Sequence, residues 1–381
     1  MNPFIFGETV TNENFCNRKN EIKDLVEEIK NCQNIMIFSP RRFGKTSLVF
    51  KVLEKIENKS FIPFYIDLFP VLTEKDFVDL SISSFSKLFK KDIKSMLINI
   101  KNFFKNINPS VSISVSPDGT PSANITFSEK DIIPVIKDVF NGIYNTLKSK
   151  NKKGIIVFDE FQQIGEIDNP GKIEKALRGV IQNHRNISYI FMGSKKHLLV
   201  DMFENPNRPF YKSSLHFPID KIETDVFSVF VKNKFLKTKR NISDDLSKKI
   251  IEISENHPYY TQMLSHTIWS NSSENNTITS EHIKLAIKTI LKREEPAFFN
   301  IWNNLSINQK KLLIAISSKE PEDKIFSSKI IRKYNLKSSS SIQRSMSQLE
   351  KKDIIDKNKE YFDINDVFFK HWILQIFNTK D

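Results

Sequence analysis

A glycine, a lysine and a threonine stand together at residues 44–46, directly after the apolar segment Ile35–Phe38. The segment has the composition of a buried strand, and apolar residues at helical spacing follow from Leu48 onward. A loop between a strand and a helix can surround phosphate with backbone N–H groups and a helix N-terminus. Lysine adds a cation for the outer phosphates, and a threonine hydroxyl is a ligand for Mg2+. The spacing therefore predicts a site for a nucleoside triphosphate.

The predicted phosphate loop departs from the regular pattern at its first position, where Ser39 stands in place of glycine. The turn must therefore close on a residue that carries a side chain. A chance Gly-Lys-Thr in a lysine-rich chain is the alternative, and the flanking strand and helix favour the phosphate loop. The residues expected to contact the nucleotide here are Ser39, Pro40, Arg41, Arg42, Phe43, Gly44, Lys45, Thr46 and Ser47.

Two adjacent carboxylates end a second apolar segment, Gly154–Phe158. We expect Asp159, together with Thr46, to hold Mg2+. Glu160 is predicted to orient and deprotonate the attacking water, with Lys45 as the catalytic cation. The alternative is that Asp159 caps the helix that follows. Since carboxyl ends of parallel strands share one edge of a sheet, the phosphate loop favours the catalytic interpretation.

Composition indicates a protein of two or three domains with an ordinary hydrophobic core: 381 residues, 39% hydrophobic and 27% charged. No apolar run reaches the roughly 20 residues that span a bilayer, and the N-terminus lacks the order of a secretory signal. Cys16 and Cys32 fit a reducing compartment. We expect a cytoplasmic protein without membrane contact. The net charge of +13 suits a polyanionic partner, although lysine runs such as residues 148–153 are also usual on solvated surfaces.

Alternating strands and helices predict an α/β fold built on a parallel sheet. A serine-rich hairpin with a turn at Asp118-Gly119 is expected to interrupt it as an exposed insertion without chemistry. The expected strands are 61–68, 154–158, 187–192 and 215–219, the expected helices are 74–106, 132–147 and 173–184, and the hairpin covers 107–130.

Three further side chains are candidates for contacts to the reacting phosphate. Ser194 follows the strand 187–192, at the sheet edge where ligands bind, and is predicted to sense the outer phosphate; a turn serine is the alternative. Arg208 and Lys212 compete for the role of a cation that stabilises transition-state charge. Solvated loop charges are the alternative for both.

The chain becomes helical from about residue 222, and its last part, from Asn304, has the pattern of a winged helix-turn-helix. Helices are expected at 309–317, 327–334 and 341–351, followed by a strand pair at 354–356 and 361–363. The recognition helix would present Ser338 to Ser341, Gln343, Arg344 and Ser347, which suit phosphate and base-edge contacts. Modules of this kind also bind proteins, so DNA and protein both stay open as partners.

With these motifs in place, the chain resembles the prokaryotic, archaeal-type AAA+-related ATPases of the STAND class with a C-terminal winged helix. The resemblance spans nearly the whole length and implies a P-loop domain, a helical lid and a winged helix. It implies that Phe15, Arg18 and Pro258 lie beside the base. The matching residues outside the loop and the acidic strand are Asn2, Pro3, Phe4, Gly7, Val10, Phe15, Arg18, Glu21, His257, Pro258, Tyr259, Tyr260, Gln262, Leu264, Asp366, Phe368, Phe369 and Trp372.

Three positions depart from the family pattern. Ser39 and Asn256 each replace a usual glycine, and Ser213 stands near the place where many members carry an arginine. The last departure puts an arginine finger within this chain in doubt, so Lys212 or a partner would have to supply the cation.

We predict an AAA+-like P-loop ATPase that hydrolyses ATP slowly, with ATP or ADP and Mg2+ as ligands, and acts as a nucleotide-dependent switch. Nucleotide-dependent self-association is a further expected partner interaction. The alternative is a DNA-binding regulator whose nucleotide is never hydrolysed. No Asn-Lys-x-Asp motif for guanine and no kinase substrate pocket is recognisable. The predicted domains are 1–221 (ATPase), 222–300 (lid) and 301–381 (winged helix).

Overall fold

The computed structural model describes residues 1–10, 14–56, 60–86, 88, 110–115, 121–126, 132–167, 170–318, 325–358 and 361–377. The chain divides into two compact units. The first consists of residues 1–17, 40–44 and 220–381, and the second of residues 18–39 and 45–219. Each is described by itself below.

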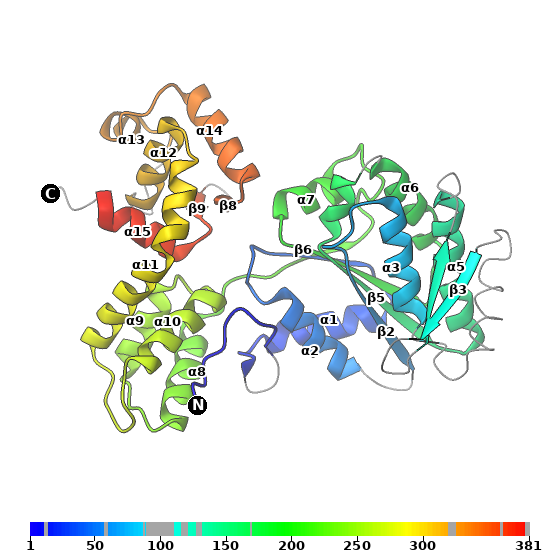
Figure 1. The fold of residues 1–381 in the computed structure, drawn as a ribbon, viewed down its shortest axis with the longest axis horizontal. Coiled ribbons are helices and arrows are strands. Elements are labelled where there is room, and N and C mark those ends of the chain that lie inside the picture. Colours follow the sequence, from blue (N-terminus) through cyan, green and yellow to red (C-terminus); the bar gives the residue numbers. More distant parts are fainter. Residues whose placement is uncertain are drawn as a thin grey trace. The chain divides into compact units, whose positions relative to one another are not determined.

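The second unit is built on a five-stranded sheet with the order β2-β5-β6-β1-β7, in which all neighbouring strands are parallel (Figure 1). The strands β5 and β6 are buried along almost their whole length, as expected for central strands covered on both faces. The strands are β1 (Ile35–Phe38), β2 (Phe61–Asp67), β5 (Lys153–Asp159), β6 (Ile187–Gly193) and β7 (Leu215–Pro218).

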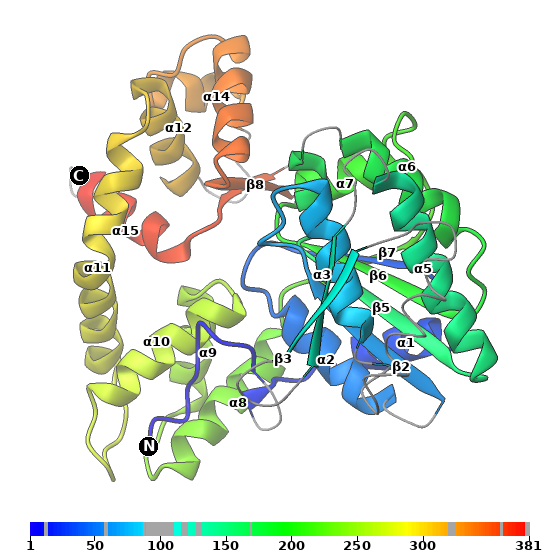
Figure 2. The same cartoon turned by 45° about the vertical axis from the view of Figure 1, so that its right-hand side comes forward.

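Helices cover both faces of this sheet. Figures 1 and 2 place α1 and α2 on one side and α3, α5 and α6 on the other. This follows from right-handed crossovers, because the chain moves one way across the sheet from β1 to β2 and then returns through β5 and β6. The helical segments are α1 (Lys19–Lys30), α2 (Lys45–Ile56), α3 (Glu74–Ser86), α5 (Ile132–Ser149), the 3-10 helix η4 (Phe161–Glu166), α6 (Pro170–Ile181) and α7 (Lys196–Glu204).

The strand register aligns the carboxyl ends of the sheet. Asp67 lies opposite Asp159, and Phe38 lies opposite Gly193. The loops that leave β1, β5 and β6 therefore start at the same edge, which is where the sequence placed the candidate residues. The predicted strands are confirmed to within a few residues. Of the predicted helix 74–106, the part up to Ser86 is confirmed, and the rest lies almost wholly outside the described residues.

The predicted hairpin is also confirmed. Strands β3 (Ser110–Val115) and β4 (Pro121–Thr126) pair in antiparallel register, and the turn expected at Asp118-Gly119 lies outside the described residues.

The first unit contains the predicted lid and winged helix. In the C-terminal part, three helices are followed by an antiparallel strand pair and a final helix, which is the predicted winged-helix arrangement. The elements of this unit are α8 (Thr224–Lys237), α9 (Asp244–Ile253), α10 (Pro258–Ser270), α11 (Ser280–Asn303), α12 (Ile307–Ser318), α13 (Ser328–Lys333), α14 (Ser339–Lys351), β8 (Ile355–Asn358), β9 (Tyr361–Ile364) and α15 (Val367–Phe377).

The N-terminal segment packs on the lid helices within this unit. The Phe4 ring centroid lies 4.7 Å from that of Phe235 in α8, and the Asn2 side-chain amide donates to the His266 carbonyl in α10 at 3.0 Å. The buried Lys234 ammonium donates to the Pro3 carbonyl and to the side chain of Asn14. Burial of an aromatic ring and of a lysine that has acceptors fixes this segment on the lid.

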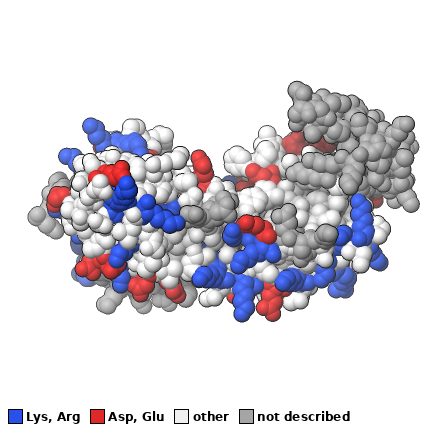
Figure 3. All heavy atoms as spheres, turned by 90° about the horizontal axis from the view of Figure 1, so that it is seen from below, with Lys and Arg blue, Asp and Glu red and all other residues white. Residues whose placement is uncertain are grey.

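The surface charge is mixed in sign on the face drawn in Figure 3, where acidic side chains stand among the lysines and arginines. The net charge of +13 is therefore not gathered into one uninterrupted basic surface on that face. Among the described residues, no helix is both long enough and apolar enough to cross a membrane.

Candidate nucleotide site

The lysine of the predicted phosphate loop is buried at the start of α2. Lys45 is 7% exposed, and its ammonium donates to the carbonyl oxygen of Ser39 at 3.0 Å and to the Ser39 hydroxyl at 3.3 Å. The left-handed conformations of the loop fall on Arg42 and Gly44, at φ 63° and 85°. A Cβ on Gly44 would meet no atom within 4 Å, so glycine is required there by conformation and not by space.

The first acidic residue receives three hydrogen bonds, from α2, from β2 and from the turn residue that follows it. The Thr46 hydroxyl lies 3.1 Å from Asp159 Oδ2, the Tyr65 hydroxyl donates to the same oxygen, and the Glu160 backbone N–H donates to Oδ1 at 2.9 Å. Asp159 is only 8% exposed, and this burial raises its pKa, against the hydrogen bonds from Tyr65 and Thr46 that lower it. The structure thus brings both predicted Mg2+ ligands into contact.

The second acidic residue sits at the turn between β5 and η4. Glu160 has a left-handed backbone, with φ at 52°. Its Oε2 accepts from the Ser194 hydroxyl at 2.9 Å, from the Ser194 backbone N–H at 3.3 Å, and from the side-chain amide of Gln162. Ser194 therefore lies at the sheet edge where the sequence placed it, and there it contacts Glu160. Whether it also senses phosphate stays a prediction.

The two candidate cations have other partners in this structure. Arg208 Nη2 lies 2.8 Å from Glu174, which is fully buried in α6, and its Nε lies 3.7 Å from Asp201. Burial raises the pKa of Glu174, and the charge of Arg208 opposes that rise. The Lys212 ammonium lies 5.3 Å from the ring centroid of Tyr211. Arg208 thus compensates a buried carboxylate, and a catalytic role of either residue stays a prediction.

Comparison with known proteins assigns the chain to a family. Residues 15–264 match a family described as an ATPase domain predominantly from Archaea, and residues 296–375 match a probable winged helix domain. The first match covers well over half of the chain. The protein belongs to this archaeal-type ATPase family.

Curated relatives of the chain include uncharacterized ATP-binding proteins of Methanocaldococcus jannaschii. One is 25% identical over 254 residues, which are 63% of this chain and 64% of that protein. Another is 25% identical over 205 residues, which are 50% of this chain and 56% of that protein. The chain spans about half the length of the curated relatives it matches.

Solved structures share the fold of the chain, among them a Walker-type ATPase and an ORC2 protein. A Walker-type ATPase of Pyrococcus abyssi superposes with a TM-score of 0.65 at 16% identity, over 98% of this chain and 99% of that one. The ORC2 protein of Aeropyrum pernix, solved with ADPNP and ADP, gives 0.55 at 10% identity, over 95% of both chains. At these identities the likeness concerns the fold alone.

Residues 40–44 belong to the same compact unit as the lid and the winged helix. The Arg42 guanidinium lies 4.2 Å from the ring centroid of Tyr259, and the rings of Phe43 and His257 are 4.5 Å apart. Burial lowers the pKa of His257 to about 3, so its imidazole is neutral at physiological pH. Two residues of the lid motif therefore contact the loop.

The winged helix also contacts this loop segment. Arg41 Nε lies 2.9 Å from Oδ2 of Asp353, in the turn that follows α14. The Asn365 side-chain amide donates to the Asp353 carbonyl at 2.9 Å, which fixes the backbone that carries the carboxylate.

The residues expected beside the base lie in different settings. Arg18 is buried at the start of α1 and pairs with Glu21 at 3.1 Å. Pro258 is the first residue of α10, where its missing N–H costs nothing, and Phe15 is half-buried. A contact of these three residues with adenine stays a prediction.

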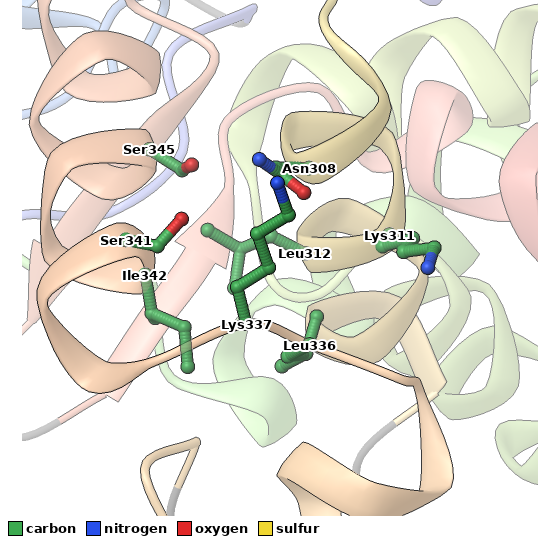
Figure 4. Close-up of a pocket in the computed structure, with 8 residues that line it drawn as sticks. All are labelled: Asn308, Lys311, Leu312, Leu336, Lys337, Ser341, Ile342 and Ser345. Carbon is green, nitrogen blue, oxygen red and sulfur yellow. The ribbon is translucent and has the colours of Figure 1, made fainter.

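The helix α14, which the sequence predicted as the recognition helix, borders a small pocket between α12 and α14. Figure 4 shows the hydroxyls of Ser341 and Ser345 turned toward Lys337 and Asn308. The predicted contact residues Ser338, Gln343, Arg344 and Ser347 are exposed on the same helix.

Sequence reasoning missed Tyr65, Gln162 and Asp353. Gln162 stands two residues after Glu160, so a nearby donor in the sequence was a usable signal. Tyr65 was recognisable only once β2 was known to lie beside β5, because the contact depends on strand order. Asp353 is distant from the loop in sequence, and no local pattern indicates its partner.

Proposed function

We propose that this protein binds ATP with Mg2+, hydrolyses it slowly to ADP and phosphate, and uses the bound nucleotide as a switch. One observation carries the hydrolytic part: the side chains after β1, β5 and β6 converge, with Thr46 on Asp159 and Ser194 on Glu160. Membership of an ATPase family and the ATP-binding description of its curated relatives support the nucleotide.

The donor set suits a hard divalent cation. Thr46 and Asp159 offer a hydroxyl and a carboxylate, the oxygen ligands that Mg2+ takes beside nucleotide phosphates. The hydrogen-bond donors to Asp159 named above are neutral, so a cation would offset the cost of burying its charge. We propose that these two residues hold Mg2+, which when bound would polarise the phosphate oxygens.

The remaining chemistry falls to Lys45 and Glu160. Lys45 would exchange its bonds to Ser39 for the outer phosphates and neutralise charge there. Glu160 would accept a proton as the water oxygen bonds to the γ-phosphorus. The bond between that phosphorus and its bridging oxygen breaks, and its electron pair leaves with ADP. Ser194, Arg208 and Lys212 stay proposals as further contacts to the transferred group.

Substitution of Glu160 separates hydrolysis from binding. In Glu160→Gln we expect ATP turnover to fall at least about a hundredfold, because general base catalysis contributes factors of that order. ATP binding should be retained. In Lys45→Ala, ATP should no longer raise the melting temperature, a stabilisation of about 2.7 kcal/mol at a hundredfold excess over Kd in the wild type.

A coupled phosphate-release assay and thermal melting measure the two effects, with Glu166→Gln on the exposed part of η4 as the matched control. Wild-type turnover in Glu160→Gln would remove Glu160 as the base. ATP binding without turnover in the wild type would instead favour the alternative of a DNA-binding regulator whose nucleotide is bound structurally.

The switch is proposed from the contacts of residues 40–44. Three residues of this segment, Arg41, Arg42 and Phe43, contact Asp353 in the winged helix and Tyr259 and His257 in the lid. A phosphate group that moves Arg41 or Arg42 would therefore change the contacts of this segment with the lid and with the winged helix. Mg-ATP would favour one arrangement of these contacts and ADP another.

The winged helix is proposed to contact DNA or a protein, and nucleotide-dependent self-association is proposed beside it. Exposed hydroxyl, amide and guanidinium groups on α14 favour DNA as the first partner to test. The division into an ATPase domain (1–221), a lid (222–300) and a winged helix (301–381), the STAND class and the cytoplasmic location are likewise proposals.

A further inference from the structure

The carboxylate of Glu160 is anchored through a single oxygen. Three donors meet Oε2: the Ser194 hydroxyl, the Ser194 backbone N–H and the Gln162 amide. Two of them come from the residue that follows β6, and the third comes from η4. Hydrogen bonds to a charged acceptor are stronger than those between neutral groups, so this set defines the orientation of the carboxylate.

The hydrogen bonds of the Gln162 side chain do not by themselves account for its burial. Its side chain is 3% exposed, and its Oε1 is buried without a hydrogen-bond donor in the described part of the chain. A buried polar atom without a partner carries a cost that a satisfied or apolar side chain would avoid. The opposite amide orientation would place Oε1 against the Glu160 carboxylate, so the N–H group must point to Glu160.

The neighbouring strand leaves space for this side chain. A Cβ on Gly193, the last residue of β6, would lie 2.1 Å from Gln162 Oε1 and 3.2 Å from its Cδ. Every residue larger than glycine would therefore displace the Gln162 amide. Gly193 also lies directly before Ser194, so one short segment supplies both the space for Gln162 and two of the donors to Glu160.

We propose that Gln162 is a positioning residue for the hydrolysis of ATP. Together with Ser194 it fixes one carboxylate oxygen of Glu160, so that the other oxygen is presented to the attacking water in a constant orientation. The inference rests on the proposed role of Glu160 as the base. Gln162 itself contacts neither nucleotide nor water in this proposal, and it acts only through Glu160.

The test compares turnover with binding. Gln162→Met has a similar length and lacks the amide, and Gln162→Glu keeps the shape and loses the donor. We expect both to lower kcat about tenfold or more, because even a slight misorientation of the Glu160 carboxylate lowers the rate of proton transfer by a factor of this size. The Kd for Mg-ATP should change less than about twofold, because no bond to the nucleotide is lost. Gln163→Met is the matched control, since the Gln163 amide is directed to the Val71 carbonyl and not to Glu160.

Gly193→Ala tests the same contact from the other side. Alone, it should reduce kcat as the Gln162 variants do. Combined with Gln162→Ala, which vacates the space, it should add little to the loss caused by Gln162→Ala. Additive losses would mean that Gly193 acts independently of Gln162.

The outcomes separate the two proposals. If Glu160→Gln is inactive while both Gln162 variants bind ATP and turn over at the wild-type rate, the positioning role fails and the base stands. If Glu160→Gln is fully active, the proposed function of Glu160 fails first. A rise of kcat in the Gln162 variants would overturn the proposal too, because it would make Gln162 a restraint on Glu160. If the Gln162 variants do not fold, the Gly193→Ala pair decides.

Discussion

At the scale of single residues, buried ionisable groups are the most informative feature of the second unit. Asp159, Glu174 and His184 are all buried, yet they have different partners. Asp159 is surrounded by neutral donors, Glu174 has an arginine, and His184 has polar groups on both ring nitrogens. Since the hydrogen-bond donors to Asp159 in the described part of the chain are neutral, Asp159 is a candidate ligand site, whereas Arg208 pairs with Glu174 and polar groups meet the His184 ring.

His184 illustrates a buried group with a structural role. Its Nδ1 lies 2.7 Å from the Tyr189 hydroxyl, its Nε2 lies 3.2 Å from Asn141 Oδ1, and its ring stacks on Tyr144 at 4.5 Å. Burial lowers the pKa of His184 to about 4 from the ordinary value of 6.5. Its neighbours from α5 and β6 are polar or aromatic side chains, so the fold accommodates the neutral form of the imidazole.

The pH dependence of stability follows from this pKa. Between pH 6.5 and 4 the unfolded chain binds the proton before the folded one, so the free energy of unfolding falls as the pH falls. This group should cost the wild type about 2 kcal/mol between pH 7 and pH 5. His184→Gln should reduce that loss by a similar amount. Urea unfolding followed by circular dichroism at the two pH values measures it, and equal losses in both proteins would contradict the assignment.

The residues of the candidate site differ in how well the sequence could predict them, and the difference depends on how local the sequence pattern is. Lys45, Thr46, Asp159 and Glu160 were predictable, because each stands at a fixed place after an apolar strand. The Ser194 contact to Glu160 was partly predictable, since its strand ends at the same edge. The ion pair of Arg208 with Glu174 was not predictable, because in the sequence Glu174 has the position of an ordinary exposed charge on an amphipathic helix.

At the scale of elements, periodicity predicted most strands and helices of both units. The winged-helix strands and the hairpin were predicted with their pairing, because short alternating segments separated by a turn determine it locally. The order of the central sheet was harder to predict. Alternating strands and helices indicate a parallel sheet, but they do not say that β6 lies between β1 and β5.

The helix α14, the predicted recognition helix, allows a test of DNA binding. Lys337 lies just before α14, Arg344 is exposed on its second turn, and α14 begins with three exposed or half-exposed serines. If α14 binds DNA, the logarithm of the binding constant should fall linearly with the logarithm of salt concentration. Lys337→Ala combined with Arg344→Ala should reduce that slope by about 2, because two phosphate contacts are lost. Fluorescence anisotropy with a duplex measures the slope.

Lys284→Ala on the exposed face of α11 serves as the control for that measurement. Binding that does not depend on salt, or a slope that stays constant in the double variant, would count against DNA and in favour of a protein partner.

At the scale of the whole molecule, the chain does not divide as its sequence order suggests. Residues 40–44 lie between β1 and α2 of the second unit, yet they group with the lid and the winged helix. Three residues of that segment contact elements more than 200 positions away in sequence. Long-range contacts of this kind leave no periodic signal, which is why the sequence indicated the loop and the winged helix but not their connection.

The Arg41–Asp353 pair makes that connection testable. The two side chains are 56% and 26% exposed, so the pair contributes at most about 1 kcal/mol. If Arg41 must leave Asp353 to contact phosphate, that contribution opposes nucleotide binding. Asp353→Asn should then tighten the binding of Mg-ATP by up to about fivefold. By linkage, bound nucleotide should weaken the ion pair in the wild type by the same factor.

Titration with a fluorescent ATP analogue measures this affinity, and Asp363→Asn on β9 is the matched control, because it removes a winged-helix carboxylate of the same type. Arg41→Ala decides the direction of the effect. It removes the ion pair and the proposed phosphate contact together, so it should not tighten binding, and Asp353→Asn in that background should have no further effect. An unchanged or weaker affinity in Asp353→Asn alone would mean that Arg41 reaches phosphate without leaving the winged helix, and the coupling of nucleotide to this module would have to run through Tyr259 and His257 instead.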